Sequence, residues 1–285
     1  MSLNTKKTST LPIMTWTRRK FIKAGLFTGV GFILLNSFWL EKYFIETNDF
    51  CLGNATDDNF DLKVIQISDL HLQSLNSQLK KLAKNINEQK PDLILITGDS
   101  VDNKKNVFVL NQFLSKIDNS IKKFAILGNW EYWGGLDLED LRMSYAANNC
   151  ELLINNSRQV TFKNKTISIT GIDDYVGGKA DIDLALKEFT QSDYHIILNH
   201  CPEYGDMIAE KLKGKVAYDF MLSGHTHGGQ INLFGFVPFK PQGSGKYLKG
   251  WYTDKNLYVS KGIGTSIFPG RFMAKAEIAV FKMLT

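Results

Sequence analysis

Cysteine is scarce in this chain, and the few cysteines present cannot build a disulfide framework. The 285 residues contain only Cys51, Cys150 and Cys201. Three thiols this far apart in sequence lack the paired spacing that is typical of a small disulfide-bonded domain. Cys51 also lacks the small-residue surroundings of a lipidation site. We therefore expect the cysteines to be incidental to fold and function.

Acidic residues are absent from the start of the chain. No Asp or Glu precedes residue 24, and the basic residues of that stretch are Lys6, Lys7, Arg18, Arg19, Lys20 and Lys23. They account for the excess behind the net charge of +5, so the rest of the chain is close to neutral. A basic nucleic-acid-binding surface is not supported, and we expect no nucleic-acid partner.

Charged residues are also absent from Ala24 to Leu40, a run of seventeen residues rich in Phe, Leu, Ile and Gly. Such a run is typical of a membrane segment or of the apolar core of a signal peptide. As a helix it would span about 25 Å, short of a hydrocarbon core of about 30 Å. Tyr43 and Phe44 extend it, and Trp39 suits a membrane interface. The length is marginal but sufficient for one span.

Residues 17–23, with Arg18 and Arg19, resemble a twin-arginine export signal. The basic flank predicts that the N-terminus faces the cytoplasm and that the remainder lies outside. Only Gly53-Asn54-Ala55 faintly resembles a cleavage site. We expect residues 1–45 to be an uncleaved single-pass anchor in a bacterial inner membrane. The alternatives are a removed signal peptide and a buried helix with a chance Arg-Arg pair.

The remaining chain predicts one α/β domain. Residues 48–59 are polar and loop-like, so we expect a linker over 46–60 and a catalytic domain over 61–285. Strand-like runs at 64–67, 93–96 and 124–127 alternate with amphipathic helical stretches at 78–89 and 107–117. This β-α-β-α-β order predicts parallel strands.

The second half of the chain predicts a second, more antiparallel sheet. Three strand-like segments, 151–154, 158–162 and 166–170, follow one another with little room for helices. Helical patterns return at 182–189 and 203–212, and further strands are expected at 196–198, 220–222, 230–233, 257–260 and 276–281. Residues 234–252, rich in Gly, Pro and aromatics, predict a long loop near the site. Two sheets packed face to face, with helices outside, fit this order.

Polar clusters occur where five of the apolar strand runs stop. In α/β proteins, functional groups gather outside the carboxyl ends of such strands. Each cluster alone is a weak signal, since Gly-Asp or Gly-Asn is usually only a turn. The chain has only five histidines, however, and four lie in these clusters, while His195 begins a strand and is expected to be structural. The set suits a two-metal centre with a bridging group, and its members are Asp69, His71, Asp99, Asn129, His200, His225 and His227.

The ordered motifs resemble those of the calcineurin-like metallophosphoesterases over nearly all of residues 61–285. They are Asp69-x-His71, Gly98-Asp99-x-x-Asp102, Gly128-Asn129-x-Glu131, Asn199-His200-x-Pro202 and Gly224-His225-Thr226-His227-Gly228-Gly229-Gln230. The tail resembles the membrane-associated bacterial branch that includes the YkuE-type phosphoesterases. That branch is similar to the UDP-2,3-diacylglucosamine hydrolases of lipid A synthesis. The tail residues concerned are Gly262 to Ser266, Pro269, Arg271 and Ala276 to Ile278.

The resemblance implies a four-layer α/β/β/α sandwich, here preceded by a hydrophobic N-terminal helix. It implies that Asp99 bridges two divalent ions. One ion would take Asp69, His71 and His227, and the other Asn129, His200 and His225. Oxygen and nitrogen ligands admit Mn, Fe and Zn alike. Two such ions activate a shared hydroxide and clamp a phosphoryl oxygen, so the resemblance implies a hydrolase of phosphoric esters or pyrophosphates.

Two catalytic candidates follow from the same motifs. Asn129 would act as ligand and orienting group. Asp102 would support the loop of Asp99, with direct substrate contact as the alternative.

Trp130 departs from the family pattern, in which a His after the Asn assists the leaving oxygen. An indole N–H donates a hydrogen bond but delivers no proton, so general-acid help worth about 10²–10⁴-fold is missing. We therefore expect a phosphodiester or pyrophosphate substrate with an acidic leaving group. Candidate substrate contacts are Trp130 and two possible phosphate-binding cations, Lys246 and Arg271.

The aromatic residues near the predicted metal centre indicate either an apolar approach for a lipid substrate or ordinary loop packing. The leading hypothesis is a membrane-anchored phosphoesterase acting on a lipid-linked or sugar-nucleotide substrate such as UDP-2,3-diacylglucosamine. Lipid A precursors are made on the cytoplasmic side, whereas the export signal predicts a domain outside. The alternatives are an exported general phosphodiesterase or phosphatase and a non-catalytic binding protein. The complete set of seven ligand positions argues against the latter.

Overall fold

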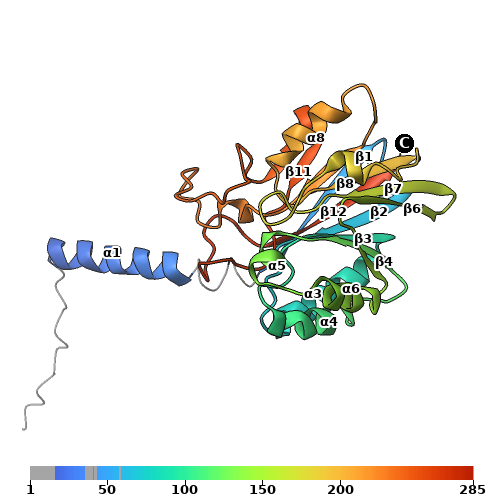
Figure 1. Ribbon diagram of the computed structural model, residues 1–285. Coiled ribbons are helices and arrows are strands. Elements are labelled where there is room, and N and C mark those ends of the chain that lie inside the picture. Colours follow the sequence, from blue (N-terminus) through green and yellow to red (C-terminus); the bar gives the residue numbers. More distant parts are fainter. Residues whose placement is uncertain (1–16, 36–40, 42–43, 58, 285) are drawn as a thin grey trace, which may run out of the picture.

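The computed structural model describes residues 17–35, 41, 44–57 and 59–284, which contain two six-stranded sheets (Figure 1). In spatial order the first sheet contains β1 (Glu46–Gly53), β12 (Glu277–Leu284), β2 (Leu62–Ile67), β3 (Leu93–Thr97), β4 (Lys122–Ile126) and β5 (Cys150–Leu152). The second contains β10 (Gly250–Tyr252), β11 (Leu257–Val259), β9 (Phe220–Ser223), β8 (Tyr194–Leu198), β7 (Lys165–Gly171) and β6 (Asn156–Phe162).

Helices accompany each sheet. Those of the first half are α3 (Ser77–Gln89), α4 (Val107–Leu114), α5 (Asn129–Trp133) and α6 (Leu138–Ala146). Those of the second half are α7 (Ile182–Ala185) and α8 (Tyr204–Leu212), and α1 (Arg18–Leu35) precedes both sheets. Short 3-10 turns lie at η2 (Lys104–Asn106), η3 (His227–Gly229) and η4 (Thr253–Lys255).

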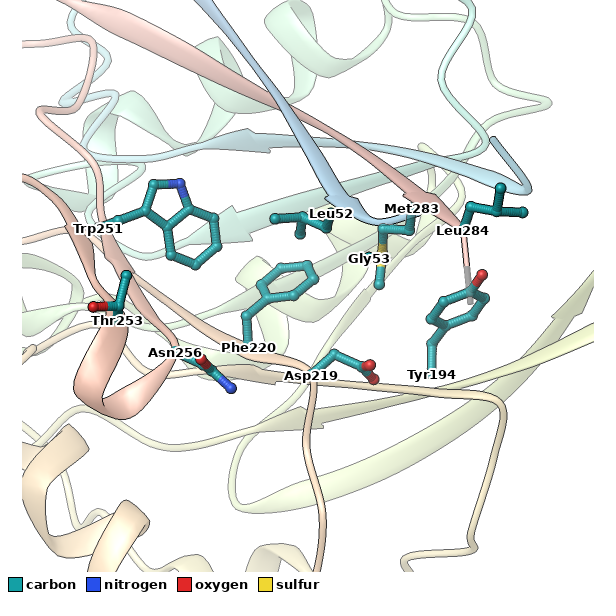
Figure 2. Close-up of a pocket in the computed structure, with 10 residues that line it drawn as sticks. All are labelled: Leu52, Gly53, Tyr194, Asp219, Phe220, Trp251, Thr253, Asn256, Met283 and Leu284. Carbon is teal, nitrogen blue, oxygen red and sulfur yellow. The ribbon is translucent and has the colours of Figure 1, made fainter. Parts of the chain in front are cut away.

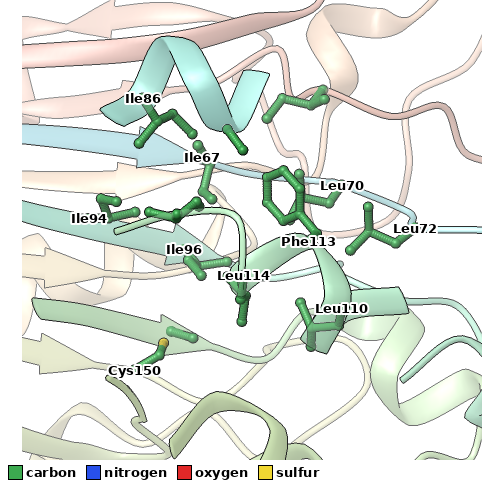
Figure 3. Close-up of a cluster of buried hydrophobic side chains, with 14 of the residues drawn as sticks. Ile67, Leu70, Leu72, Ile86, Ile94, Ile96, Leu110, Phe113, Leu114 and Cys150 are labelled. Carbon is green, nitrogen blue, oxygen red and sulfur yellow. The ribbon is translucent and has the colours of Figure 1, made fainter. Parts of the chain in front are cut away.

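Alternation along the strands produces three cores. In β2, Ile65 packs against the helices, whereas its neighbour Val64 lies between the two sheets. Figure 3 shows the core between the first sheet and its helices, in which Ile94 and Ile96 of β3 cluster with Ile86 of α3 and Leu114 of α4. A third core joins β8, β9 and β11 to α7 and α8. The predicted pair of sheets is confirmed, and the cores give the layer order α/β/β/α.

Parallel pairing brings the functional ends of the strands to one edge. β2, β3 and β4 are parallel neighbours, as the sequence predicts, and β7, β8 and β9 are parallel neighbours in the second sheet. The carboxyl ends of β2, β3, β4, β8 and β9 therefore meet at one edge of the two facing sheets. The predicted metal-ligand clusters follow these strands.

The predicted linker over 46–60 is wrong for its first half, because residues 46–53 form β1. This strand pairs in parallel with β12 from Glu46–Glu277 to Gly53–Leu284. β1 is an edge strand whose side chains are half-buried or exposed, so its composition stays polar. β1 is held in the sheet by main-chain pairing and by Phe50, whose ring stacks on that of Phe281 with 5.5 Å between the ring centres.

Other predictions also need correction. The second sheet is mixed, because β7–β8, β8–β9 and β9–β11 are parallel, whereas β6–β7 and β10–β11 are antiparallel. The expected strand at 151–154 joins the first sheet as β5, and the expected strand at 230–233 contributes only isolated bridges. The sequence interpretation did not identify α5 and α6.

The helix α1 begins within the basic stretch and includes part of the apolar run. Phe21, Leu26 and Phe27 are among its exposed apolar side chains. Residues 1–16, 36–40 and 42–43, which belong to the anchor predicted over 1–45, lie outside the described residues. None of the helices in the described part of the chain combines the length and apolar character needed to cross a membrane.

A cavity lies at the edge where β8 and β9 begin, away from the clusters that follow the strand ends (Figure 2). It has a volume of about 460 Å³. Phe220 and Trp251 line one part of it, and Met283 and Tyr194 another. Figure 2 shows that Asp219 is its one acidic side chain. This cavity contains none of the predicted metal ligands.

The role of β1 predicts a stability effect. Phe50→Ala should lower the free energy of unfolding by about 2 kcal/mol or more, because the ring packs against Phe281, Tyr258 and Trp251. Cys51→Ser is the matched control, since the neighbouring side chain is exposed. Denaturant unfolding measures both. Equal, small effects would mean that residues 46–53 behave as the linker suggested by their composition.

Candidate metal centre

All seven predicted metal-ligand side chains meet in one buried cluster. Each is 5% exposed or less. The turns that carry them are held together by main-chain hydrogen bonds: Asp69 N–H donates to Gly98 O at 3.1 Å, and His71 N–H to Asp99 O at 3.0 Å. Gly224 N–H donates to His200 O at 3.1 Å. The cluster is therefore built by the strand ends of both sheets.

One group of potential ligands contains Asp69, His71, Asp99 and His227, each offering one atom within 4.8 Å of the others. His227 Nε2 lies 3.6 Å from Asp69 Oδ1, and His71 Nε2 lies 3.8 Å from Asp99 Oδ2. The two imidazole Nε2 atoms are 3.1 Å apart. Two carboxylates and two imidazoles are a suitable ligand set for a divalent transition metal.

A second group contains Asp99, His200 and His225. His200 Nε2 is 3.3 Å from Asp99 Oδ2, and His225 Nδ1 is 3.3 Å from His200 Nε2. Asn129 Oδ1 lies 2.9 Å from His225 Nδ1, which adds an amide oxygen to this group. Asp99 belongs to both groups, so its carboxylate is placed to be shared.

Hydrogen bonds fix the ring nitrogens that face the cluster. His200 Nδ1 lies 2.7 Å from Thr97 O, and His225 Nε2 lies 2.7 Å from Gln242 O. A carbonyl oxygen can only accept, so these nitrogens carry the protons, and the opposite nitrogens present lone pairs to the cluster. Such outer partners commonly orient the histidine ligands of metals. The donor set and its orientation therefore fit a metal centre.

Asp102 orients His71. Its Oδ1 lies 2.5 Å from His71 Nδ1, which leaves Nε2 directed at the cluster. Burial alone would lower the pKa of His71, but the Asp102 hydrogen bond and the charge of Asp99 raise it. The sequence interpretation expected Asp102 to support the loop of Asp99, whereas its side-chain hydrogen bond is to His71.

Arg271 is placed differently from the expected phosphate contact. Its side chain is fully buried, and its guanidinium donates to the carbonyls of Lys261, Gly264 and Ala274. Nη2 lies 3.3 Å from His227 Nδ1. Burial and the neighbouring His71 and Arg271 charges lower the pKa of His227 well below its usual value. Arg271 therefore supports the His227 turn from behind.

The two other candidate substrate contacts lie nearer the surface. Trp130 is half-buried, its ring 6.0 Å from the His71 ring and 5.6 Å from that of Trp133. Its main-chain N–H donates to Asp99 Oδ1 at 2.9 Å. Lys246 is exposed, with Nζ 5.3 Å from the centre of the Tyr247 ring.

Glu131 is a positioning residue that the sequence interpretation assigned no role. Its buried carboxyl group accepts hydrogen bonds from the main-chain N–H groups of Gly128, Asp99, Ser100 and Val101 at 2.6–3.3 Å. Burial and the charge of Asp99 raise its pKa to about 8. The signal available in sequence was its place in the Gly128-Asn129-x-Glu131 motif.

The backbone of the centre is strained. Five of the seven candidate ligands have positive φ values, including 51° at Asp69, 52° at Asp99 and 73° at His225. Non-glycine residues rarely adopt this conformation, and it persists where the surrounding structure enforces it. Gly128 must lack a side chain, because a Cβ there would overlap the Asp99 carboxylate. The strain thus coincides with the chemically reactive cluster.

Electrostatics favour cations in this cluster. Burial opposes ionisation of both aspartates and raises the pKa of Asp69, although the neighbouring His200 charge acts the other way. For Asp99 the charges of His200 and His71 outweigh burial and hold its pKa well below the usual value. Two buried carboxylates this close together need cationic partners, which divalent ions would supply.

Comparison with known proteins matches this architecture to a family. Residues 62–229 match the family described as calcineurin-like phosphoesterase. An uncharacterized metallophosphoesterase, YkuE, of Bacillus subtilis (strain 168) is 31% identical, covering 94% of this chain and 97% of that protein. An uncharacterized metallophosphoesterase of Helicobacter pylori (strain J99) is 31% identical, and the match covers 94% of this chain and 73% of that protein. The phosphodiesterase YaeI of Escherichia coli (strain K12) is 26% identical over 94% and 99%.

The position of Glu131 predicts a coupled loss of stability and metal affinity. Glu131→Gln should destabilise the protein by about 1–3 kcal/mol, because an amide NH₂ would face main-chain N–H donors. The loosened Asp99 turn should also bind metal less tightly. Thermal unfolding and calorimetric metal titration measure the two effects, and exposed Glu139→Gln is the control. Wild-type values in both assays would exclude this role.

Proposed function

The chain belongs to the calcineurin-like phosphoesterase family and is a metal-dependent phosphoester hydrolase, and on this premise we propose that it cleaves phosphodiester or pyrophosphate bonds with two divalent ions. The observation that carries the proposal is the sharing of Asp99 by two buried ligand groups. Asp69, His71 and His227 would hold one ion, and Asn129, His200 and His225 the other. Their identity would be Mn, Fe or Zn, which this ligand set does not discriminate.

The chain's own residues prepare the site. Bound divalent ions would supply a nucleophilic water at neutral pH and a clamp for phosphoryl oxygens. Asp102 and the carbonyls of Thr97 and Gln242 hold three imidazoles in the ligating orientation. The Trp130 N–H and the donors gathered by Glu131 keep Asp99 in place. Pre-organised ligands reduce the cost of binding.

No histidine remains to protonate the leaving oxygen. Four of the five imidazoles lie in the cluster, and the fifth, His195 of β8, lies with Nε2 2.8 Å from Thr170 Oγ1 and Nδ1 2.9 Å from Ala217 O. Trp130 occupies the position of the family's acid. The substrate should therefore have a leaving group stable as an anion, such as a nucleoside monophosphate released from a pyrophosphate.

A lipid-linked or sugar-nucleotide substrate, with UDP-2,3-diacylglucosamine as the specific candidate, combines such a leaving group with apolar chains. Exposed Phe268 and Trp133 support an apolar approach near the centre. An exported phosphodiesterase or phosphatase of broader range is the second candidate, supported by the name of the relative YaeI. Both candidates use the same metal centre.

We further propose that the N-terminal segment anchors the protein in a bacterial inner membrane, with the catalytic domain outside the cytoplasm. The support is the basic Arg18–Arg19 flank followed by an uncharged run, and the exposed apolar side chains of α1. An outside domain would not meet a lipid A precursor made in the cytoplasm. The anchor and the specific substrate are therefore separable proposals.

The missing acid predicts a marked leaving-group preference. Nitrophenyl phosphodiesters should be hydrolysed faster than alkyl phosphomonoesters, and Trp130→His should accelerate the alkyl ester by about tenfold or more. Steady-state rates on both substrates measure this, with Asp99→Asn as the inactive control. Similar rates on both, or no change in Trp130→His, would contradict the proposal.

Topology decides between the two substrate classes. Protease added to spheroplasts should remove an epitope tag at the C-terminus if the domain lies outside, and should leave the tag intact if the domain lies in the cytoplasm. With an outside domain, purified full-length protein should prefer general phosphodiesters over UDP-2,3-diacylglucosamine. A cytoplasmic domain with the opposite preference would establish the lipid A candidate.

A further inference from the structure

A group of apolar side chains projects into solvent from two neighbouring loops, which we call the apolar rim. Such large exposed apolar groups, when clustered, mark interaction surfaces. Four of the five are at least two-thirds exposed. The members are Phe234 (86% exposed), Phe236 (68%), Phe239 (67%), Ile267 (80%) and Met273 (41%).

Hydrogen bonds and a ring contact hold the tip of the first loop, around Phe234, in an outward-facing position. Leu233 and Phe236 bridge across the tip, and Asn232 Oδ1 accepts from Gly235 N–H at 2.6 Å. Phe234 has a φ of 55°, an unfavourable conformation for an aromatic residue that the turn enforces. The Phe234 ring contacts Phe272 of the second loop at 6.5 Å, edge to face. The exposure is therefore built into the loops.

The rim borders the metal centre. The first loop begins directly after Gln230, three residues after His227. The second loop is bonded to the same residue: Phe272 N–H donates to Gln230 O at 2.8 Å, and Ser266 N–H to Gln230 Oε1 at 3.3 Å. The first loop continues to Gln242, whose carbonyl holds His225. Figure 1 shows these orange to red loops extending from the end of the molecule that carries α5.

The surroundings of the rim are basic. Between residues 220 and 276 the only acidic residue is Asp254. Lys240, Lys246 and Lys249 are exposed, and within the described part of the chain they form no ion pair with a carboxylate. Lys249 Nζ lies 3.3 Å from the carbonyl of Met273, within the rim itself. Apolar tips framed by lysines are complementary to an anionic lipid surface.

The N-terminal segment enters the domain at the same place. Glu41 Oε2 accepts from the N–H of Ala274 at 3.0 Å, and its carbonyl accepts from Ala276 N–H at 3.3 Å. Ala274 follows Met273 of the rim. The helix α1 ends at Leu35, six residues before Glu41, so the chain that carries its exposed apolar side chains joins the domain beside the rim.

We infer that the apolar rim is a second membrane contact, docking on an anionic phospholipid bilayer and holding the metal centre at the lipid surface. Phe234, Phe236 and Ile267 enter the interface, and Lys240 and Lys249 face the headgroups. The contact is independent of hydrolysis and of whether residues 1–45 span the bilayer. If the rim does not bind membranes, the proposed phosphoesterase activity is unaffected.

The test locates the rim separately from α1. Two full-length proteins, each with Cys51→Ser, carry an environment-sensitive fluorophore at Phe236→Cys or at Phe108→Cys. Phe108 is the matched control because it is 61% exposed on α4. On vesicles of phosphatidylethanolamine with phosphatidylglycerol, the probe at 236 should shift to the blue and be quenched by lipid-borne quenchers, whereas that at 108 should not. Equal responses of the two probes would overturn the inference.

Charge reversal tests the lipid class. Lys240→Glu and Lys249→Glu should each weaken vesicle binding reported by the 236 probe by about fivefold or more, because each removes a lysine charge near an anionic surface and adds a negative one. An undiminished response, or an equal one on phosphatidylcholine vesicles, would overturn the assignment to anionic lipid. A lipid-independent response that grows with protein concentration would instead assign the rim to a second copy of the chain. Hydrolysis of a soluble nitrophenyl diester should remain at the wild-type rate in both variants.

Discussion

The shared carboxylate of Asp99 is the constraint on which the site depends. It follows β3, between imidazoles supplied by both sheets, and its burial removes its charge from bulk solvent. The surrounding structure consequently supplies donors: Trp130 N–H to its oxygen, and a turn held by the carboxylate of Glu131. The parallel strand order is what brings these groups to one edge.

The orientation of the ligands in this centre is determined mainly by groups that are not ligands themselves. Main-chain carbonyls of Thr97 and Gln242, and the carboxylate of Asp102, determine which imidazole nitrogens are free. One of these, Gln242, belongs to the long loop that also carries part of the apolar rim. The loop on the surface and the ring in the cluster are thus parts of one hydrogen-bonded assembly.

The ligand clusters could be predicted because this chemistry demands rare residue types at strand ends, and four of five histidines occur there. β1 could not, because an edge strand with one half-buried face has the composition of a loop. The Gln242 contact leaves no trace in sequence, since every residue has a carbonyl. The sequence could not show whether Arg271 contacts phosphate or is buried, because a guanidinium can donate equally well to a phosphate or to a set of buried carbonyls.

The pairing of β1 with β12 has a practical consequence for handling the molecule. A chain trimmed at residue 60, where the regular α/β pattern begins, would leave the long edge of β12 open, with the aromatic face of Phe281 partly uncovered. Open edges of this kind template pairing between molecules. Solubility during expression therefore depends on an eight-residue segment that looks dispensable.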